Sequence, residues 1–199
     1  MVMVQALLTM VAAFAATVVF ASPLDSHDQS SGSVALAQGK PEITVTETDG
    51  VYRASATFVV TAPMTMVSAV LTDYERIPKF MPDVKRSQVL ERSETGLVVE
   101  QEATAKFMMF SKKVHLVLDV SQDGGTIRFR DRCGKSFKTY EGAWRLTSSG
   151  RSTTVVYELA ARPTFEVPPF VLKRLLKRDA SVMIDRLKAE IETRADLRQ

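Results

Sequence analysis

Few residues of this chain could act as nucleophiles, bases or metal ligands. The sequence holds one cysteine, Cys133, and two histidines, of which only His115 lies beyond the first 37 residues. A Cys-His or Ser-His-Asp site needs a histidine base, and the strand pattern places His115 on a solvent-facing side beside Lys113 and Asp119. Cys133 is therefore predicted to be structural. His and Cys residues do not recur at metal-ligand spacing, so we expect neither a metal nor a cofactor.

Tyrosines and arginines offer a second route to chemistry. Tyr140, Tyr157 and Arg145 could transfer protons or stabilise an oxyanion in a cyclase-type reaction. Both tyrosines fall on the apolar side of their predicted strands, and a buried tyrosine usually only finds a hydrogen-bond partner within the core. The residues therefore predict a binding protein without catalytic residues, and an enzyme of the cyclase type is the alternative.

Two segments combine apolar and basic residues in a way that suits a membrane surface. In the first, four large apolar residues fall where the strand pattern predicts a turn, and lysines follow them: Phe107, Met108, Met109, Phe110, Lys112 and Lys113. These apolar residues could touch lipid or close one end of the core. The second segment, 173–178, holds four cations at the start of an amphipathic pattern, which predicts either membrane contact or a core helix with a solvated face.

A third basic segment contains Arg128, Arg130 and Arg132. Residues two positions apart on a strand point to the same side of the sheet. We therefore expect the three guanidinium groups on one solvated outer face, and anion binding is the alternative.

The N-terminal residues differ from the rest of the chain. Residues 5–21 carry no charge, which is typical of a signal peptide and barely sufficient for a membrane anchor. Small residues that suit cleavage end at Ala21 and Ala37, and a polar, Ser-rich linker lies between them. We therefore expect an exported protein, periplasmic or extracellular, that stays anchored if the leader is not cleaved.

The residues after this leader predict one globular domain over 38–199. The chain is 45% apolar and 25% charged, which is the composition of a folded protein rather than a disordered one. About 160 residues are enough for one buried core. Removing residues 1–37 raises the formal charge from +3 to +5, because Asp25 and Asp28 are lost. This charge suits an anionic membrane surface but is too weak to predict nucleic-acid binding.

A hairpin and two short helices are predicted first. Apolar residues alternate on both sides of Asp49-Gly50 between residues 42 and 61, and this dipeptide favours a tight two-residue turn. Thr61 is placed to cap the helix that follows. Asp73 is placed to cap a second short helix.

Strands and a long helix make up the rest of the domain. Between residues 84 and 160, short runs alternate apolar and polar residues and are separated by turn residues, which predicts about six antiparallel strands. From about Pro168 the apolar period changes to that of a helix, with a stripe over 172–191 that Asp179 interrupts. The order predicts an α+β fold in which a curved antiparallel sheet wraps around the C-terminal helix.

Three motifs resemble those of a known family. Residues 70–82 read VLTDYERIPKFMP, residues 140–144 read YEGAW, and residues 162–168 read RPTFEVP. They resemble the START-like (SRPBCC) superfamily, and within it the polyketide cyclase/dehydrase and coenzyme Q-binding group, over about residues 61–195. The resemblance implies a helix-grip fold of the START or Bet v 1 type, with two short helices after the first strand.

The same resemblance implies a ligand cavity between the sheet and the final helix. The occupant it implies is an apolar small molecule such as a lipid, an isoprenoid quinone or a polyketide-like compound. The alternative is a cyclase or dehydratase that acts on a ligand in that cavity. Position in or beside the motifs assigns part of the cavity wall: Phe80, Tyr140, Trp144 and Met183. Strand and helix periodicity assigns the other wall residues: Phe129, Tyr157 and Leu187.

Overall fold

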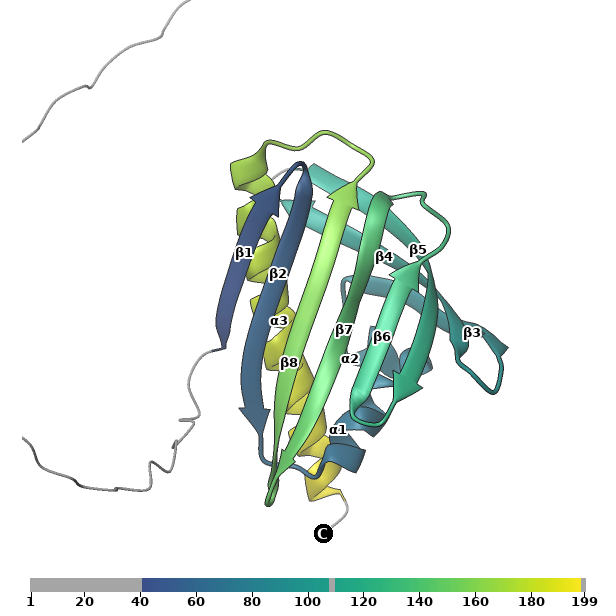
Figure 1. The fold of residues 1–199 in the computed structure, drawn as a ribbon, viewed down its shortest axis with the longest axis vertical. Helices are drawn as coiled ribbons and strands as arrows, with labels where there is room; N and C mark the ends of the chain where they lie inside the picture. The colour runs from purple at the N-terminus through teal and green to yellow at the C-terminus, as the bar shows by residue number, and fades with distance from the viewer. Residues whose placement is uncertain (1–40, 108–109, 198–199) are drawn as a thin grey trace, which may run out of the picture. The chain divides into compact units, whose positions relative to one another are not determined.

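One antiparallel sheet of eight strands dominates the computed structural model, which describes residues 41–107 and 110–197. The strands follow the order β1-β2-β8-β7-β6-β5-β4-β3, so the N-terminal hairpin pairs with the last strand of the sequence (Figure 1). Their bounds are β1 Glu42–Thr48, β2 Val51–Val60, β3 Val84–Arg92, β4 Leu97–Phe107, β5 Phe110–Asp123, β6 Thr126–Asp131, β7 Phe137–Ser149 and β8 Ser152–Pro163.

The predicted hairpin at the start of the domain is confirmed. Asp49 and Gly50 turn between β1 and β2 with φ angles of 53° and 75°. Glycine adopts such angles without strain, and Asp tolerates them better than most residues. The Glu47 carboxylate also accepts a hydrogen bond from the Gly50 N–H at 3.0 Å. The local sequence therefore determines this turn.

Three short helical elements follow the second strand rather than the first: α1 Met64–Leu71, η1 Tyr74–Arg76 and α2 Ile77–Phe80. The predicted cap at Thr61 is wrong, and the predicted cap at Asp73 is right in position but not in its hydrogen bond. Pro63, not Thr61, precedes the first turn of α1, and its C=O accepts hydrogen bonds from the N–H groups of Met66 and Val67. Asp73 does precede η1, but its side chain makes no capping hydrogen bond. A stronger partner, the guanidinium of Arg194, lies 2.9 Å from its carboxylate.

Asp73 belongs to a cluster of charges that ties the short helices to the C-terminal part of α3 (Pro169–Asp196). Arg194 Nε donates a hydrogen bond to Glu190 Oε1 at 2.7 Å. Arg76 lies 3.7 Å from Asp73 and 3.8 Å from Glu190. We call these four residues the helix clasp. The side chains of Glu190 and Arg194 are only 15% and 18% exposed, so water screens their attraction less than that of an open surface pair.

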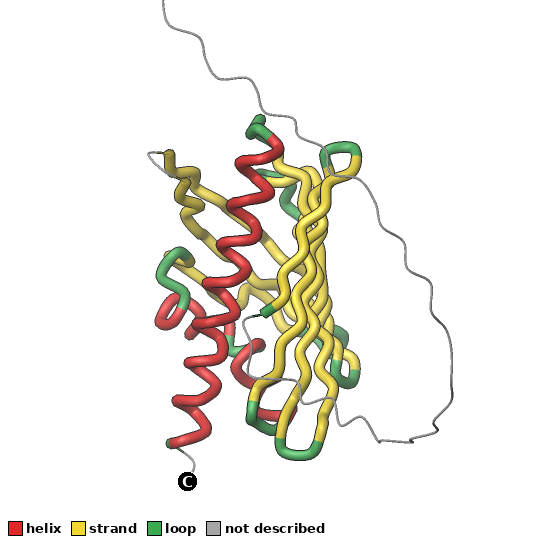
Figure 2. Tube along the Cα trace, turned by 90° about the vertical axis from the view of Figure 1, so that its left-hand side faces the viewer, coloured by secondary structure: helices red, strands yellow, loops and turns green. Residues whose placement is uncertain are grey.

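Helix α3 packs an apolar stripe against the sheet, as predicted. Its first residue is a proline, whose fixed φ angle suits the first turn of a helix. The helix contacts β1, β2 and α1, and the sheet curves around it (Figures 1 and 2). Its buried residues are Leu172, Ala180, Ile184, Leu187 and Ile191. Asp179 interrupts this stripe and is half-buried beside Arg178, and burial raises the pKa of its carboxyl.

The core consists of two apolar clusters that meet at a few shared side chains. One lies between α1, α3 and strands β1, β2, β7 and β8, and the other lies between η1 and strands β4–β6. Val155 and Val99, in the two clusters, are fully buried. The side chains packed against both clusters are only half-buried: Leu71, Phe129, Phe137, Tyr140 and Trp144. The predicted helix-grip architecture is thus confirmed.

Candidate functional site

The inner face of the sheet brings together the residues predicted for a cavity wall. Trp144 on β7 pairs with Tyr157 on β8, and their ring centroids lie 4.4 Å apart. The ring centroids of Phe129 on β6 and Tyr140 on β7 lie 5.9 Å apart. All seven predicted wall residues belong to one apolar cluster or pack against it: Phe80, Phe129, Tyr140, Trp144, Tyr157, Met183 and Leu187.

Burial divides these residues into two kinds. Tyr157 and Leu187 are core residues, with 6% and 2% of their surface exposed. Phe129, Tyr140 and Trp144 also face the inner side of the sheet, yet each remains half-buried. Each of these three residues therefore keeps part of its surface uncovered by the rest of the protein.

Gly142 shapes this wall through its missing side chain. It lies opposite Phe129 in the pairing of β6 with β7. A Cβ atom on Gly142 would lie 2.6 Å from Phe129 Cζ and would also overlap the C=O of Glu158. The glycine of the YEGAW motif is therefore required for the Phe129 ring to lie across β7.

The two inner tyrosines are neutral over the physiological pH range. Burial and, to a smaller extent, the negative charge of Asp131 raise the pKa of Tyr140 to about 12. Burial likewise raises the pKa of Tyr157 well above its ordinary value. A neutral phenol donates a hydrogen bond well but is a poor base. These hydroxyls therefore suit hydrogen bonding to a ligand better than proton abstraction.

Sequence reasoning missed a polar pair on the inner face. Gln101 on β4 and Ser87 on β3 lie opposite each other, and Gln101 Nε2 donates a hydrogen bond to Ser87 Oγ at 3.2 Å. Ser87 is 7% exposed. The alternation Leu97, Val99, Gln101 carries the signal, because it places a glutamine at an inward position of the strand. An amide and a hydroxyl thus give the β3–β4 side of the interior some hydrogen-bonding capacity.

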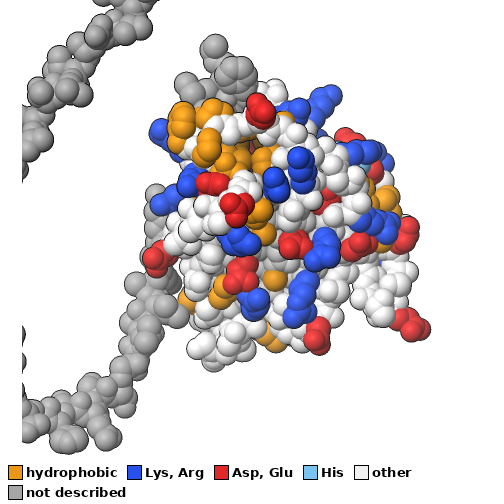
Figure 3. All heavy atoms as spheres, turned by 45° about the horizontal axis from the view of Figure 1, so that its top comes forward, with side chains coloured by type: hydrophobic (Ala, Val, Ile, Leu, Met, Phe, Trp, Pro, Cys, Tyr) orange, Lys and Arg blue, Asp and Glu red, His pale blue; other side chains and the backbone are white. Residues whose placement is uncertain are grey.

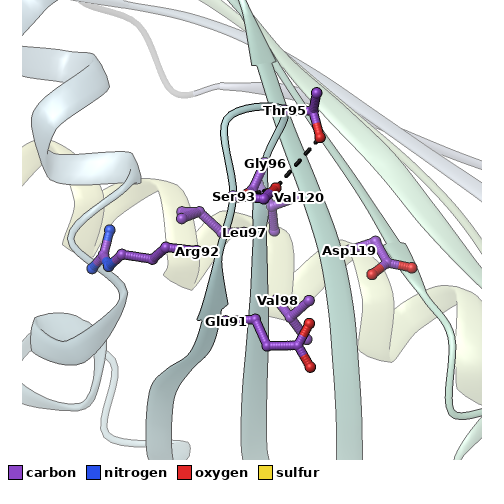
Figure 4. Close-up of a pocket in the computed structure, with 9 residues that line it drawn as sticks. All are labelled: Glu91, Arg92, Ser93, Thr95, Gly96, Leu97, Val98, Asp119 and Val120. Atoms are coloured by element: carbon purple, nitrogen blue, oxygen red, sulfur yellow. Dashed lines mark hydrogen bonds between the residues drawn. The ribbon is translucent and has the colours of Figure 1, made fainter.

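A small hollow of about 230 Å³ lies at the β3–β4 hairpin (Figure 4). Hairpin residues between Glu91 and Val98 form it together with β5. Ser93 Oγ donates a hydrogen bond to the C=O of Gly96 at 3.1 Å within this hairpin. None of the seven predicted wall residues lines the hollow, so it is not the predicted cavity.

A larger groove of about 730 Å³ lies before the start of α3. The start of β2 with its turn, Lys138 on β7, the end of β8 and the link 164–168 between β8 and α3 line it. Phe165 of this link lies 6.5 Å from Phe137, measured between ring centroids, and Lys112 Nζ lies 5.1 Å from the centroid of the Phe165 ring. The link is therefore packed against β5 and β7.

The two segments predicted to contact a membrane approach each other. Arg178 Nη2 on α3 donates a hydrogen bond to the C=O of Lys106, near the end of β4, at 2.7 Å. Phe170 at the start of α3 is 75% exposed. Figure 3 looks onto this end of the domain and shows a group of apolar side chains with lysines, arginines and a few acidic side chains around it.

The structure describes only part of the first membrane segment. Lys112 and Lys113 are exposed. Met108 and Met109 lie outside the described residues. Phe107 and Phe110 are described without their side chains. Among the helices of the described ranges, none is long and apolar enough to cross a membrane.

The outer face of the sheet is polar, as predicted. Arg130 pairs with Glu141 at 2.7 Å, and Arg132 pairs with Asp119 at 3.3 Å. His115 also faces outward, as predicted, but it is only partly solvated. Its side chain is 24% exposed, because Glu100 of the neighbouring strand contacts it. Within residues 41–107 and 110–197, no group of His, Cys, Asp and Glu side chains is placed to hold a metal ion.

The sequence of the chain matches one known protein family. The model of the family described as polyketide cyclase/dehydrase and lipid transport matches residues 60–188. The chain belongs to this family. The matched part of this polyketide cyclase/dehydrase and lipid transport domain runs from the end of β2 into α3 and includes all seven wall residues. No curated protein matches the chain.

Solved structures show the same fold. A START superfamily protein from Mycobacterium smegmatis is 18% identical, with a TM-score of 0.63 over 71% of this chain and 97% of that one. The Zhui aromatase/cyclase from Streptomyces sp. R1128 is 17% identical, with a TM-score of 0.63 over 73% and 96%. A STAR-related lipid transfer protein fragment from Xanthomonas axonopodis is 16% identical, with a TM-score of 0.60 over 77% and 99%. The fold is therefore START-like.

Proposed function

We propose that this domain binds an elongated, mostly apolar small molecule between the sheet and α3 and carries it. The observation that supports this most directly is the incomplete burial of Phe129, Tyr140 and Trp144 at the junction of the two core clusters. A ligand that covers these rings would gain the free energy of burying their apolar surface. Lipid transport in the family description and lipid transfer in one structural neighbour point the same way.

The chemistry of the inner face narrows the ligand class. The polar groups on the wall are neutral: the hydroxyls of Tyr140 and Tyr157 and the Ser87–Gln101 pair. A charged ligand would find no opposite charge among these groups. A long chain or ring system with one or two neutral oxygen atoms therefore fits best. Isoprenoid quinones and neutral lipids have this chemistry.

The single tryptophan gives a direct test of binding. Trp144 is the only tryptophan, and it lies on the wall, so a ligand in the interior should change its fluorescence. We expect an isoprenoid quinone to quench it at micromolar concentrations. Phe129→Ala should weaken this binding, whereas Arg128→Ala, on the neighbouring outward position, should not. No fluorescence change, together with no small molecule in an organic extract of the purified protein, would contradict the proposal.

Catalysis on a bound polyketide-like compound is the second candidate, since the fold is shared with an aromatase/cyclase. The raised pKa values of Tyr140 and Tyr157 speak against these residues as bases. His115 lies on the outer face, opposite the wall. Incubation with a poly-β-ketone substrate and mass spectrometry of the products separates the two candidates. A product that has lost water, and whose formation Tyr140→Phe abolishes, would favour the enzyme.

We also propose that the end of the domain around the start of α3 docks on an anionic membrane. Phe170 supplies exposed apolar surface, and Lys173, Lys177 and Lys112 supply positive charge. Each cation near such a surface contributes about 1 kcal/mol, and salt screens this attraction. Phe170→Ser should reduce sedimentation with phosphatidylglycerol vesicles, whereas Val182→Ser, at an exposed apolar position further along α3, should not. Equal binding of both variants would place the contact elsewhere.

Export follows from the leader and is proposed on the sequence alone. Residues 1–40 lie outside the described residues. Cleavage after Ala21 or Ala37 would leave a mature chain that begins at Ser22 or Gln38. Mass spectrometry of the protein purified from the periplasm or medium should find one of these N-termini. A soluble cytoplasmic chain with residue 1 intact would contradict export.

A further inference from the structure

Three side chains suited to thiol chemistry meet on the outer face of the sheet. Cys133 lies in the loop after β6, His115 lies on β5 and Glu100 lies on β4. Cys133 Sγ is 3.7 Å from His115 Nδ1, and His115 Nε2 is 3.1 Å from Glu100 Oε1. A nucleophile, a base and a carboxylate that orients the base therefore stand in a row. We call these residues the thiol triad.

Glu100 determines which nitrogen of His115 can accept a proton. A carboxylate only accepts hydrogen bonds, so the contact at 3.1 Å places the imidazole proton on Nε2. Nδ1 is then free to accept, and it faces Cys133 Sγ. The hydrogen bond from His115 lowers the pKa of Glu100 more than partial burial raises it, and the charge of Arg86 adds to this lowering. The carboxylate therefore stays ionised behind the imidazole.

Further hydrogen bonds hold His115 and Cys133 in position. Ser136 Oγ accepts a hydrogen bond from the N–H of His115 at 3.0 Å. The Asp131 carboxylate accepts hydrogen bonds from the N–H groups of Cys133 at 3.3 Å and Gly134 at 3.0 Å. The loop and the strand are thus held before any reaction begins. Because Asp131 occupies these two N–H groups, they cannot form an oxyanion hole at Cys133, and acyl transfer is disfavoured.

The thiol has two acceptors within reach. Cys133 Sγ lies 3.8 Å from the C=O of His115 and 3.7 Å from its Nδ1. A carbonyl only accepts a hydrogen bond, whereas an imidazole can take the proton completely. After that transfer, an imidazolium with Glu100 behind it faces a thiolate, and each charge stabilises the other.

Small molecules can reach the sulfur. Cys133 is partly exposed, and the side chains of His115 and Glu100 retain 24% and 20% exposure. The neighbouring Lys135 is exposed and positively charged. A low-molecular-weight disulfide is small enough to reach this partly exposed thiol.

We propose that Cys133 is an activated thiol that exchanges with low-molecular-weight disulfides. Its proton moves to His115 Nδ1, and the thiolate attacks one sulfur of the disulfide. A bond forms between Cys133 Sγ and that sulfur, while the original S–S bond breaks. The departing thiolate takes the proton back from His115. One disulfide is consumed and one mixed disulfide is made, so no further oxidant is needed. The site is separate from the inner wall and does not depend on the proposed ligand.

The rate of exchange of the purified full chain with the chromogenic disulfide dithiobis(nitrobenzoate) tests this proposal. Cys133 is the only cysteine, so Cys133→Ser should abolish the signal. Near pH 7, His115→Gln should react about tenfold or more slowly than the wild type. Glu100→Gln should react more slowly as well. Glu94→Gln is the control, because Glu94 is an exposed carboxylate in the turn between β3 and β4 and is not one of the charged groups that face the triad. It should leave the rate unchanged.

The pH dependence distinguishes proton transfer from simple access. At about pH 10 an ordinary thiol is ionised without help, so the rates of wild type and His115→Gln should converge. The titratable and charged groups that face the triad are Arg86, Glu102, Lys113, Asp131 and Lys135. If the ratio of the wild-type rate to the His115→Gln rate were the same near pH 7 and near pH 10, the proposal would be overturned. Such a result would mean that His115 only controls access to the thiol. Equal rates of wild type and His115→Gln near pH 7 would overturn it too.

A measurement on the wild type alone covers the case in which the variants do not fold. Near pH 7 the folded protein should react faster than the same chain unfolded in urea. A slower reaction of the folded protein would show that the thiol is merely shielded, and it would overturn the proposal whatever the variants do.

Discussion

The inner and outer faces of the sheet use the same strands in different ways. On the inner face, Phe129, Tyr140 and Trp144 pack against aliphatic neighbours and stay half-buried. On the outer face, side chains such as Arg130 and Glu141 pair with each other close to water. Burial of apolar side chains on the inner face stabilises the fold. In an exposed ion pair each charged group mostly gives up water for its partner, so the pair adds little to stability.

Because of this difference, the stability of the domain depends mainly on the inner face, and reactive groups can lie on the outer face. A change on the inner face alters both the core and the room left for a ligand. A change on the outer face costs little, so a reactive group such as Cys133 can exist there without weakening the core. The two proposed activities can therefore be altered one at a time.

A charge on the inner side of α3 should have the largest effect. Leu187 is 2% exposed, and Leu187→Asp would put a carboxylate among apolar side chains. We expect the free energy of unfolding, measured in urea, to fall by about 3–5 kcal/mol. Ala189→Asp, two positions along and exposed, should lose under about 1 kcal/mol. Similar losses in both variants would show that α3 presents a different side to the sheet.

A single added methyl group on the inner face should have the next largest effect. Gly142→Ala would force the ring of Phe129 away from β7 and should cost about 1–3 kcal/mol in the same measurement. Thr147→Ala, exposed on the same strand, serves as the control and should cost under about 0.5 kcal/mol. If Gly142→Ala were as stable as the control, the close packing of Phe129 on β7 would be disproved.

Alkaline pH should weaken the inner face. The pKa of Tyr140 is about 12 in the folded protein, against an ordinary value of 10.0. The folded state therefore holds this proton more tightly than the unfolded chain. This contribution to stability is complete below pH 10 and is lost as the pH rises from 10 to 12. Unfolding in urea at several pH values should show Tyr140→Phe losing less stability over this range than the wild type. Parallel losses would mean that the Tyr140 hydroxyl is open to water in the folded protein.

Removing an outer-face ion pair should have the smallest effect. The side chains of Arg130 and Glu141 are 73% and 41% exposed, so Arg130→Ala should lower the free energy of unfolding by under about 1 kcal/mol. High salt should shrink even this difference, because it screens exposed charges. If Arg130→Ala lowered the free energy of unfolding as much as Gly142→Ala, the two faces would not differ in their contribution to stability.

Local sequence predicted the elements well because their causes are local. Asp49-Gly50 specifies its own turn, and the alternation in β4 specifies a strand of the observed length. The partners of polar side chains could not be predicted in this way. Asp73 pairs with Arg194, and Cys133 meets His115, only because strand register and helix packing bring distant segments together. Periodicity assigned Phe129, Tyr157 and Leu187 to the predicted wall, and position in or beside the family motifs assigned the other four residues. The Ser87–Gln101 pair required the register of β3 against β4.

The place of the N-terminal hairpin beside β8 has a consequence for the timing of folding. The first core cluster includes residues from Ile43 to Ile191, and β2 finds its second neighbour only when β8 has been synthesised. Folds dominated by contacts between distant parts of the chain form slowly, because long loops must close first. We therefore expect this domain to complete its folding only once β8 and α3 have been synthesised. Until then the open edge of β2 is a point at which chains can associate with one another.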